Sequence, residues 1–259
     1  MMAARTNWPP HLKFKIFEKE KISALMARET WIEGCVFRDV EFDRCDFRGA
    51  KDHYNTFERC VFHACRFQDA ALGIRTSRFG GCRFQDCNFK GTVFDNAVFE
   101  NTRFANCRLN GVDFSASGFW HCQFLGDVED VVFRGTYQFA SDLGRHTPVD
   151  SGLHDVDFSK ASLKWITVSN GCSIVDVALP SNGEVFIADR SRLQSDCRET
   201  VQRIFSANDA RIAEKAIELY AANDTQDRCF VTLRELKETY GSNISGKLFD
   251  TLKQCAAVP

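Results

Sequence analysis

A large apolar residue recurs at every fifth position through the middle of the chain. Between Gly81 and Phe124 the sequence reads GCRFQ DCNFK GTVFD NAVFE NTRFA NCRLN GVDFS ASGFW HCQF. A period of five matches neither the period of an α-helix nor that of a flat strand. It fits a chain that turns a corner every five residues, with one large side chain pointing inward on each side. The recurring positions are Phe84, Phe89, Phe94, Phe99, Phe104, Leu109, Phe114, Phe119 and Phe124.

A smaller residue precedes each large one by two positions, and we expect it to point inward as well. In the stretch above, these small positions include Cys82, Cys87, Cys107 and Cys122. The step from Leu72 to Phe79 is longer than five, so about two extra residues should bulge out near Gly73–Thr76. The repeat weakens after Phe124. The same large spacing continues on both sides, at Phe37, Phe42, Phe47, Phe57, Phe62, Phe67 and Leu72, and later at Phe133, Leu153, Phe158, Leu163 and Val168, with Ile174 and Leu179 shifted by one.

These residues resemble the pentapeptide-repeat family, whose consensus has a small residue, a polar residue, a central Leu or Phe and two further polar residues. The resemblance covers roughly residues 32–179. It implies a mainly β protein, a right-handed quadrilateral parallel β-helix with four pentapeptides in each coil. Residues twenty apart would then lie one rung apart, at about 4.8 Å. Phe84 would stack on Phe104, and Phe104 on Phe124, in a rod of about seven coils.

The chain divides into three segments on this interpretation. Residues 1–31 are expected to cap the first coil with a short strand or helix, because an exposed solenoid end invites association. Residues 32–185 form the β-helix. Residues 190–259 replace the period of five with a helical one and predict a small domain of about four helices. The expected helix starts are Ser195 or Asp196, Asp209, Thr232 and Ser242, and the last helix should bury Ile244, Leu248 and Leu252.

Composition excludes several kinds of partner and compartment. The formal net charge is −2, so no global field attracts nucleic acid or an anionic membrane. No run of residues is long and apolar enough to span a membrane, and the first residues lack the apolar core of a signal peptide. We therefore expect a cytoplasmic protein whose 12 cysteines are reduced.

Packing explains most cysteines better than chemistry does. Cys60, His63 and Cys65 could suggest a metal site, but His63 should point outward and the two thiols inward. His121 beside Cys122 could suggest a nucleophile, yet neighbouring residues on a strand point to opposite faces. The sequence therefore predicts no enzyme activity, no metal and no cofactor. The cysteines expected to react in the native protein lie outside the repeat: Cys197, Cys229 and Cys255.

The outward positions and the interruptions of the repeat are where function is expected. The leading hypothesis is a non-catalytic protein-interaction scaffold. One alternative is a mimic of DNA that binds and protects a type II topoisomerase such as DNA gyrase, an activity known in the family. Another is an adaptor acting through the C-terminal helices, which could also form a homodimer. The interruptions are Ala50–Thr56, Leu125–Val132 and Ala140–Gly152, and the candidate partner-binding residues are Asp127, Glu129, Asp130, Arg145 and His146.

Overall fold

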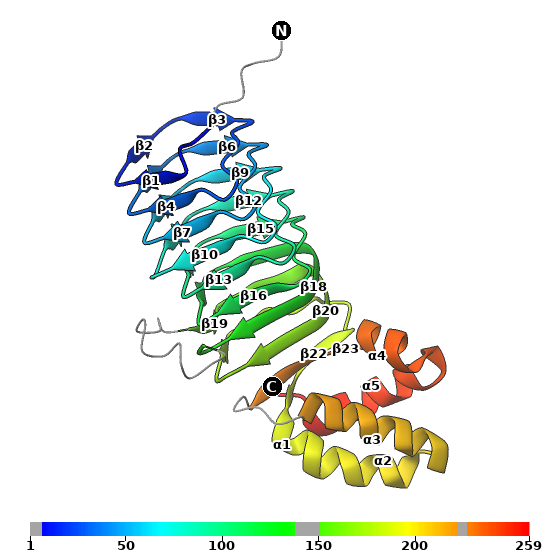
Figure 1. Cartoon of the computed structure of the whole chain (residues 1–259). Coiled ribbons are helices and arrows are strands. Elements are labelled where there is room, and N and C mark those ends of the chain that lie inside the picture. The colour runs from blue at the N-terminus through cyan, green and yellow to red at the C-terminus, as the bar shows by residue number, and fades with distance from the viewer. Residues whose placement is uncertain (1–6, 138–150, 222–226, 259) are drawn as a thin grey trace.

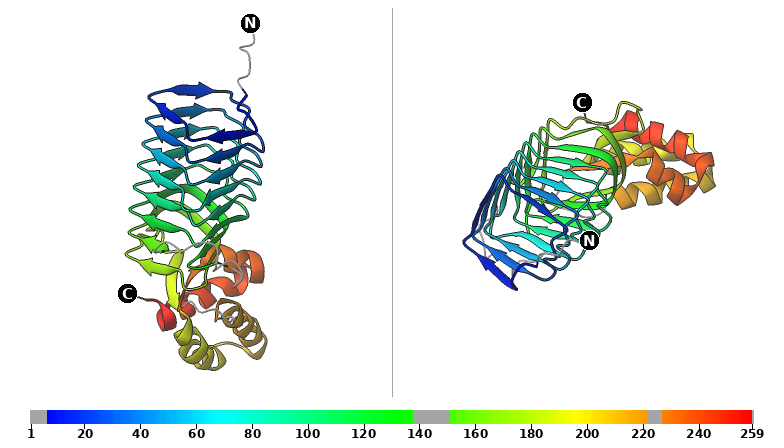
Figure 2. Two further views of the ribbon diagram at one scale, coloured as in Figure 1. Left: turned by 60° about the vertical axis from the view of Figure 1, so that its left-hand side comes forward. Right: turned by 90° about the horizontal axis from the view of Figure 1, so that it is seen from above.

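Strand pairing shows that twenty residues complete one coil of the β-helix. The computed structural model describes residues 7–137, 151–221 and 227–258. The strands of the β-helix pair in parallel, and Phe104 lies in register with Phe84 on one side and Phe124 on the other. The coils stack into a rod with the helices gathered at its C-terminal end (Figures 1 and 2). The predicted four-sided parallel β-helix is confirmed.

Each coil has four faces, three of them built from strands. The first face contains β1 (His11–Lys13), β4 (Trp31–Glu33), β7 (Lys51–His53), β10 (Ala71–Ile74), β13 (Val93–Asp95) and β16 (Val112–Ser115). The second contains β2 (Ile16–Glu18), β5 (Val36–Arg38), β8 (Thr56–Glu58), β11 (Arg78–Gly80), β14 (Val98–Glu100), β17 (Gly118–Trp120), β19 (Gly152–His154) and β21 (Ser173–Val175). The third contains β3 (Lys21–Ser23), β6 (Glu41–Asp43), β9 (Val61–His63), β12 (Arg83–Gln85) and β15 (Arg103–Ala105). On the fourth face, single parallel bridges join Asn7, Met26, Asp46, Arg66, Asn88 and Arg108.

Columns of stacked phenylalanine rings fill the interior. The ring of Phe104 lies 5.0 Å from that of Phe84 and 4.9 Å from that of Phe124, with interplanar angles of 13° and 6°. Rings of neighbouring faces meet edge to face, as between Phe99 and Phe104. Each buried ring contributes on the order of 2 kcal/mol of transfer free energy, and each stacked pair about 0.5–1.5 kcal/mol more. All nine large positions predicted between Phe84 and Phe124 are buried.

The predicted small positions lie inside as well. Cys82, Cys87, Cys107 and Cys122 are buried between the rungs, and their thiols donate to carbonyl oxygens of the preceding coil. Every cysteine of the chain is a free thiol.

The β-helix begins earlier than the boundary expected at residue 32. The segment expected to cap it forms β1, β2 and β3, which pair in register with β4, β5 and β6. The chain thus makes eight rungs on the second face, where about seven were expected. Trp8 closes this end from inside, with its ring 5.7 Å from Phe17 and 6.0 Å from Phe37.

The interruptions of the repeat differ from one another. The predicted bulge near Gly73–Thr76 is present. It lengthens the spacing between paired residues to twenty-two, as in Phe57 with Phe79. Ala50–Thr56 forms no loop: β7 continues the coil and Asp52 points into the core. Leu125–Val132 forms no loop either. It belongs to β18 (Gln123–Arg134), which pairs with β20 (Asp157–Ser169) along the third, fourth and first faces. Most of Ala140–Gly152 lies outside the described residues.

The C-terminal domain contains a two-stranded antiparallel sheet besides the expected helices. The antiparallel strands β22 (Val185–Asp189) and β23 (Arg228–Thr232) were not predicted from the sequence. Asp189, rather than Ser195 or Asp196, caps the first helix, and Ser206, rather than Asp209, accepts a hydrogen bond from the first turn of α3. Thr232 caps α4 as predicted, and Ile244, Leu248 and Leu252 are buried. The helical segments are α1 (Arg190–Arg192), a π-helical turn (Leu193–Cys197), α2 (Arg198–Ile204), α3 (Ala207–Ala221), α4 (Leu233–Tyr240) and α5 (Ser242–Ala256).

The antiparallel pair of β22 and β23 closes the C-terminal end of the β-helix. Phe230 of β23 packs edge-on against Phe158, the last ring of its column, at 6.0 Å. Two arginine side chains donate hydrogen bonds to carbonyl oxygens of the last coil: Arg228 to Ile174 at 3.1 Å, and Arg190 to Val168 at 3.2 Å. The domain therefore supplies both an apolar plug and partners for backbone groups that lack a following rung. Within the described part of the chain, no helix is long and apolar enough to cross a membrane.

Candidate interaction surfaces

A polar cluster centred on Asp52 lies in the interior of the β-helix. Its carboxylate takes the place of a phenylalanine and accepts hydrogen bonds from the side chain of Asn55 and from the backbone of Gly73 at 2.9 Å. Asn55 in turn donates to the carbonyl of Ile32 and accepts from the backbone of Cys35. Complete burial raises the pKa of Asp52 to about 6, against the hydrogen bonds that stabilise the charged form. The cluster anchors the bulge at Gly73 and is closed to solvent.

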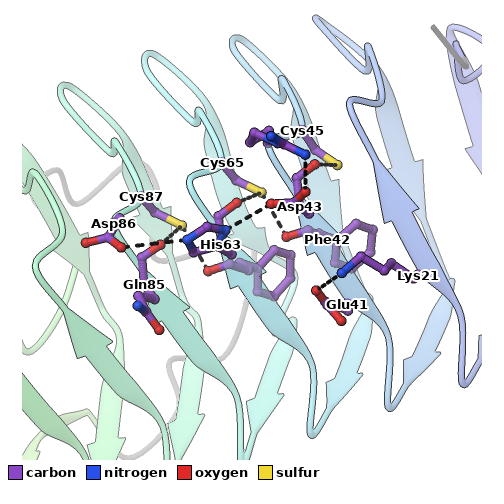
Figure 3. Close-up of polar contacts among 12 residues, drawn as sticks. Lys21, Glu41, Phe42, Asp43, Cys45, His63, Cys65, Gln85, Asp86 and Cys87 are labelled. Atoms are coloured by element: carbon purple, nitrogen blue, oxygen red, sulfur yellow. Dashed lines mark hydrogen bonds and ion pairs between the residues drawn. The ribbon is translucent and has the colours of Figure 1, made fainter. Parts of the chain in front are cut away.

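The cysteine and histidine sites considered from the sequence do not converge. His63 lies on the outer surface, where its Nδ1 is 2.9 Å from Asp43 and its Nε2 is 3.8 Å from Asp86 (Figure 3). The hydrogen bond from His63 lowers the pKa of Asp43. Cys65, by contrast, points inward and donates to the carbonyls of Phe42 and His63. Among the described residues, no three His, Cys, Asp or Glu side chains are grouped to hold a metal ion.

Cys122 and His121 also point apart. His121 is paired with Asp155 at 2.6 Å on the surface, whereas Cys122 donates inward to the carbonyl of Phe99. Burial raises the pKa of Cys122 to about 12, and burial likewise raises the pKa of Cys87. Such thiols stay protonated at neutral pH and are poor nucleophiles.

Outward side chains on successive rungs alternate in charge and form ion pairs with one another. Arg38 lies between Glu18 at 2.8 Å and Glu58 at 3.0 Å on the second face. At the next corner, Arg59 forms a two-point ion pair with Asp39. Because each side chain has a neighbour of opposite sign one rung away, these parts of the rod carry little net field.

Two of the candidate partner-binding residues are linked to the C-terminal domain of the same chain, Asp127 directly and Glu129 through Lys164 of β20. Glu129 lies 2.8 Å from Lys164, a lysine that is only 6% exposed and that also pairs with Glu238 of α4 at 2.9 Å. Asp127 lies 3.7 Å from Arg234 of α4. Hydrogen bonds to Glu129 and Glu238 raise the pKa of Lys164. This network joins β18 and β20 to α4.

The remaining candidates are Asp130, Arg145 and His146. Asp130 is exposed at the corner that follows Glu129. Arg145 and His146 lie outside the described residues. No sequence pattern pointed to Lys164 or Phe230, since each acts through a contact between segments far apart in the chain.

Comparison with known proteins agrees with this fold. Residues 55–133 match the family model named pentapeptide repeat region, so this part of the chain is a pentapeptide-repeat region, in agreement with the predicted resemblance. No curated protein matches the sequence.

Several solved structures are similar in fold, at low sequence identity. Rfr23, a pentapeptide repeat protein from the cyanobacterium Cyanothece, is 10% identical over 42% of this chain and 83% of its own, with a TM-score of 0.34. QnrB1, a plasmid-mediated fluoroquinolone resistance protein, is 13% identical over 64% of this chain and 92% of its own, with a TM-score of 0.27. HetL, involved in heterocyst differentiation regulation in the cyanobacterium Nostoc, is 10% identical over 66% of this chain and 90% of its own, with a TM-score of 0.19. These values support no transfer of function.

Proposed function

We propose that this chain is a non-catalytic scaffold that binds a protein partner on the outer faces of its β-helix. The observation that carries the proposal is the division between inside and outside. Phenylalanine rings and small side chains fill the interior, and its polar cluster around Asp52 is sealed from solvent. The outer positions, by contrast, are held on rungs about 4.8 Å apart by continuous sheets, which fixes their geometry before any partner arrives.

The C-terminal helices serve this scaffold as an end cap rather than as the adaptor considered from the sequence. Phe230 and the Lys164 network occupy the face that the domain turns toward the rod. Two lysines that could have made α5 a DNA-reading helix contact their own domain. Lys247 donates to the carbonyl of Ile204, and Lys253 lies over the ring of Phe249. A DNA-reading role and a homodimer through these helices find no support in such contacts.

Imitation of DNA is the second function weighed for this chain, and its charges do not favour it. DNA carries one negative charge per about 1.7 Å of its axis, so a mimic needs a long acidic stripe. Here the carboxylates of Glu18 and Glu58 are paired with Arg38, and Asp39 with Arg59. We expect micromolar amounts of the purified protein neither to inhibit DNA gyrase in a supercoiling assay nor to rescue it from a quinolone. Inhibition at sub-micromolar concentration would promote this alternative to first place.

Affinity purification from the native host tests the proposal. The tagged full chain, cross-linked in cells before lysis, is expected to retain a protein partner in near-stoichiometric amount, identified by mass spectrometry. A comparison variant with the same fold, in which the charges at several outer positions are reversed, should lose that partner. Recovery of the same proteins with both chains, or of none, would contradict the scaffold function.

A further inference from the structure

One part of the rod departs from the pattern of paired charges. Five cationic side chains project from the third and fourth faces of three successive coils, and all five are exposed. None of them makes an ion pair with any residue in the described ranges. We call them the basic patch: Arg66, Arg83, Lys90, Arg103 and Arg108.

The pairing of Arg83 with Arg103 is the sharpest feature of the patch. The two residues are partners on the adjacent strands β12 and β15, so their side chains leave the same face one rung apart. Like charges in register destabilise a sheet, whereas opposite charges stabilise it. Elsewhere on the rod such positions are matched, as Lys13 is with Glu33 at 2.6 Å. Where Arg28 and Arg48 project from successive coils of the fourth face, both guanidinium groups contact the carboxylate of Asp46.

The basic patch has less neutralisation of this kind. Asp46 is bridged to Arg66 on the fourth face, but its carboxylate contacts Arg28 and Arg48. In the described structure, the carboxylates on these two faces of the same coils are Asp69 and Asp86, both at corners. Asp86 is nearest to His63, at 3.8 Å. Several other outward positions there are neutral and polar: Gln68, Gln85, Asn88, Asn106 and Asn110. The other acidic residues of these coils, Asp95 and Glu100, lie on the first and second faces. The rod therefore has a basic side here, although its net charge is slightly negative.

We propose that the basic patch binds an extended acidic segment of a protein partner. This inference rests on the scaffold function and names the face and the chemistry of the ligand. Carboxylates form two-point hydrogen bonds with guanidinium groups, and a partner's carboxylate placed between Arg83 and Arg103 would relieve their repulsion.

A nucleic acid fits this face less well. Proteins that bind single strands stack bases on exposed aromatic rings, and a duplex is read by an element that enters a groove. The exposed large apolar side chains of the described chain include Tyr54 and Trp165, and none lies on the third or fourth face of these coils. The strands between the arginines expose small or polar side chains such as Gln85 and Ala105.

Fluorescence anisotropy with a labelled decaglutamate peptide tests the inference on the full chain. We expect saturable binding in 50 mM salt that weakens at least tenfold in 300 mM salt. Arg83→Glu with Arg103→Glu should weaken binding at least tenfold. The matched control is Arg211→Glu with Lys215→Glu, which makes the same change in net charge on exposed positions of α3 and should leave binding within twofold.

The single variant Arg83→Glu separates binding from folding. It places opposite charges in register with Arg103, so we expect an unchanged or higher melting temperature together with weaker peptide binding. Equal loss of binding in the control pair, or no binding of decaglutamate at any concentration up to 0.5 mM (roughly −4.5 kcal/mol), would overturn the inference. Tighter binding of a twenty-residue oligothymidine than of decaglutamate would overturn it in favour of nucleic acid. If the peptide fails while a host partner is still retained, the scaffold function stands and only this assignment falls.

Discussion

Replacing Phe104 with alanine tests whether the stacked rings hold the rod together. The ring is 1% exposed and lies between Phe84 and Phe124, with both of its faces covered at 5.0 and 4.9 Å. Loss of its transfer free energy costs about 2–3 kcal/mol, and loss of two stacked contacts about 1–3 kcal/mol. The coils above and below are joined by backbone hydrogen bonds and cannot fully collapse into the space. We expect a total loss of about 3–5 kcal/mol, in the range measured for buried aromatic residues.

Urea denaturation followed by circular dichroism measures this loss, with Phe17→Ala as the matched control. Phe17 belongs to the same repeat position, but it lies in the first coil, is half-buried and is stacked on one side by Phe37 at 4.9 Å. We expect it to lose less than half as much as Phe104. A change below about 1 kcal/mol for Phe104→Ala, or equal losses at the two sites, would refute the idea that stacking between rungs stabilises the core.

Four further results follow from the structure. Because the folded pKa of Asp52 is about 6 and its unfolded value is about 3.9, wild type should lose stability relative to Asp52→Leu as pH rises from 4 to 7, by about 2–3 kcal/mol in urea melts. A constant difference would show that Asp52 does not titrate in this range. A maleimide reagent should label Cys255 first in the native protein, and rapid labelling of Cys107 would mean that the inward frame is incorrect. Phe230→Ala should speed proteolysis of the C-terminal domain, and an unchanged cleavage rate would argue against its role as a plug. Arg83→Glu should raise the melting temperature or leave it unchanged, and a clear decrease would mean that the two arginines do not repel each other.

The repeat made the coil predictable from sequence because the central residue of each pentapeptide is the large side chain that faces the core. Phe84 to Phe124 recur without a break, so their inward direction followed from spacing alone. The first coil was harder to recognise. Its inward residues, Leu12, Phe17 and Ile22, stand among charged neighbours and resemble a capping segment until strand pairing places them in register.

Contacts between distant segments could not be predicted in the same way. Asp52 looked like an interruption because a carboxylate is costly inside a core, and its hydrogen bonds from Asn55 and from Gly73, on the next coil, make the position tolerable. Cys197 and Cys229 were expected to be reactive because they lie outside the repeat, yet both are buried in the C-terminal domain. The antiparallel strands β22 and β23 are about forty residues apart in sequence, beyond the reach of a local pattern.

The candidate surfaces likewise combine features that the repeat predicts with contacts that it does not. Outward positions were predictable from the repeat, but whether a charge is paired depends on the residue one coil away. Asp127 and Glu129 were chosen as an acidic cluster in a supposed loop, and they contact Arg234 and Lys164 of the same chain. Arg83 and Arg103 are twenty residues apart, so the repeat predicts that they lie one rung apart, and the structure adds that neither forms an ion pair with a described residue.

Site-specific photo-cross-linking in the native host tests the central claim most directly. A photoreactive amino acid placed at Val93, Glu100, Gln85 or Asn110 samples the first, second, third and fourth faces in turn without removing a residue of the basic patch. We expect a covalent adduct with one protein from Gln85 or Asn110, and we expect the Arg83→Glu, Arg103→Glu double variant to lose it. An adduct only from the first or second face would keep the scaffold and move its binding site. Absence of any protein adduct from all four faces would contradict the claim that the outer surface of this β-helix binds a protein.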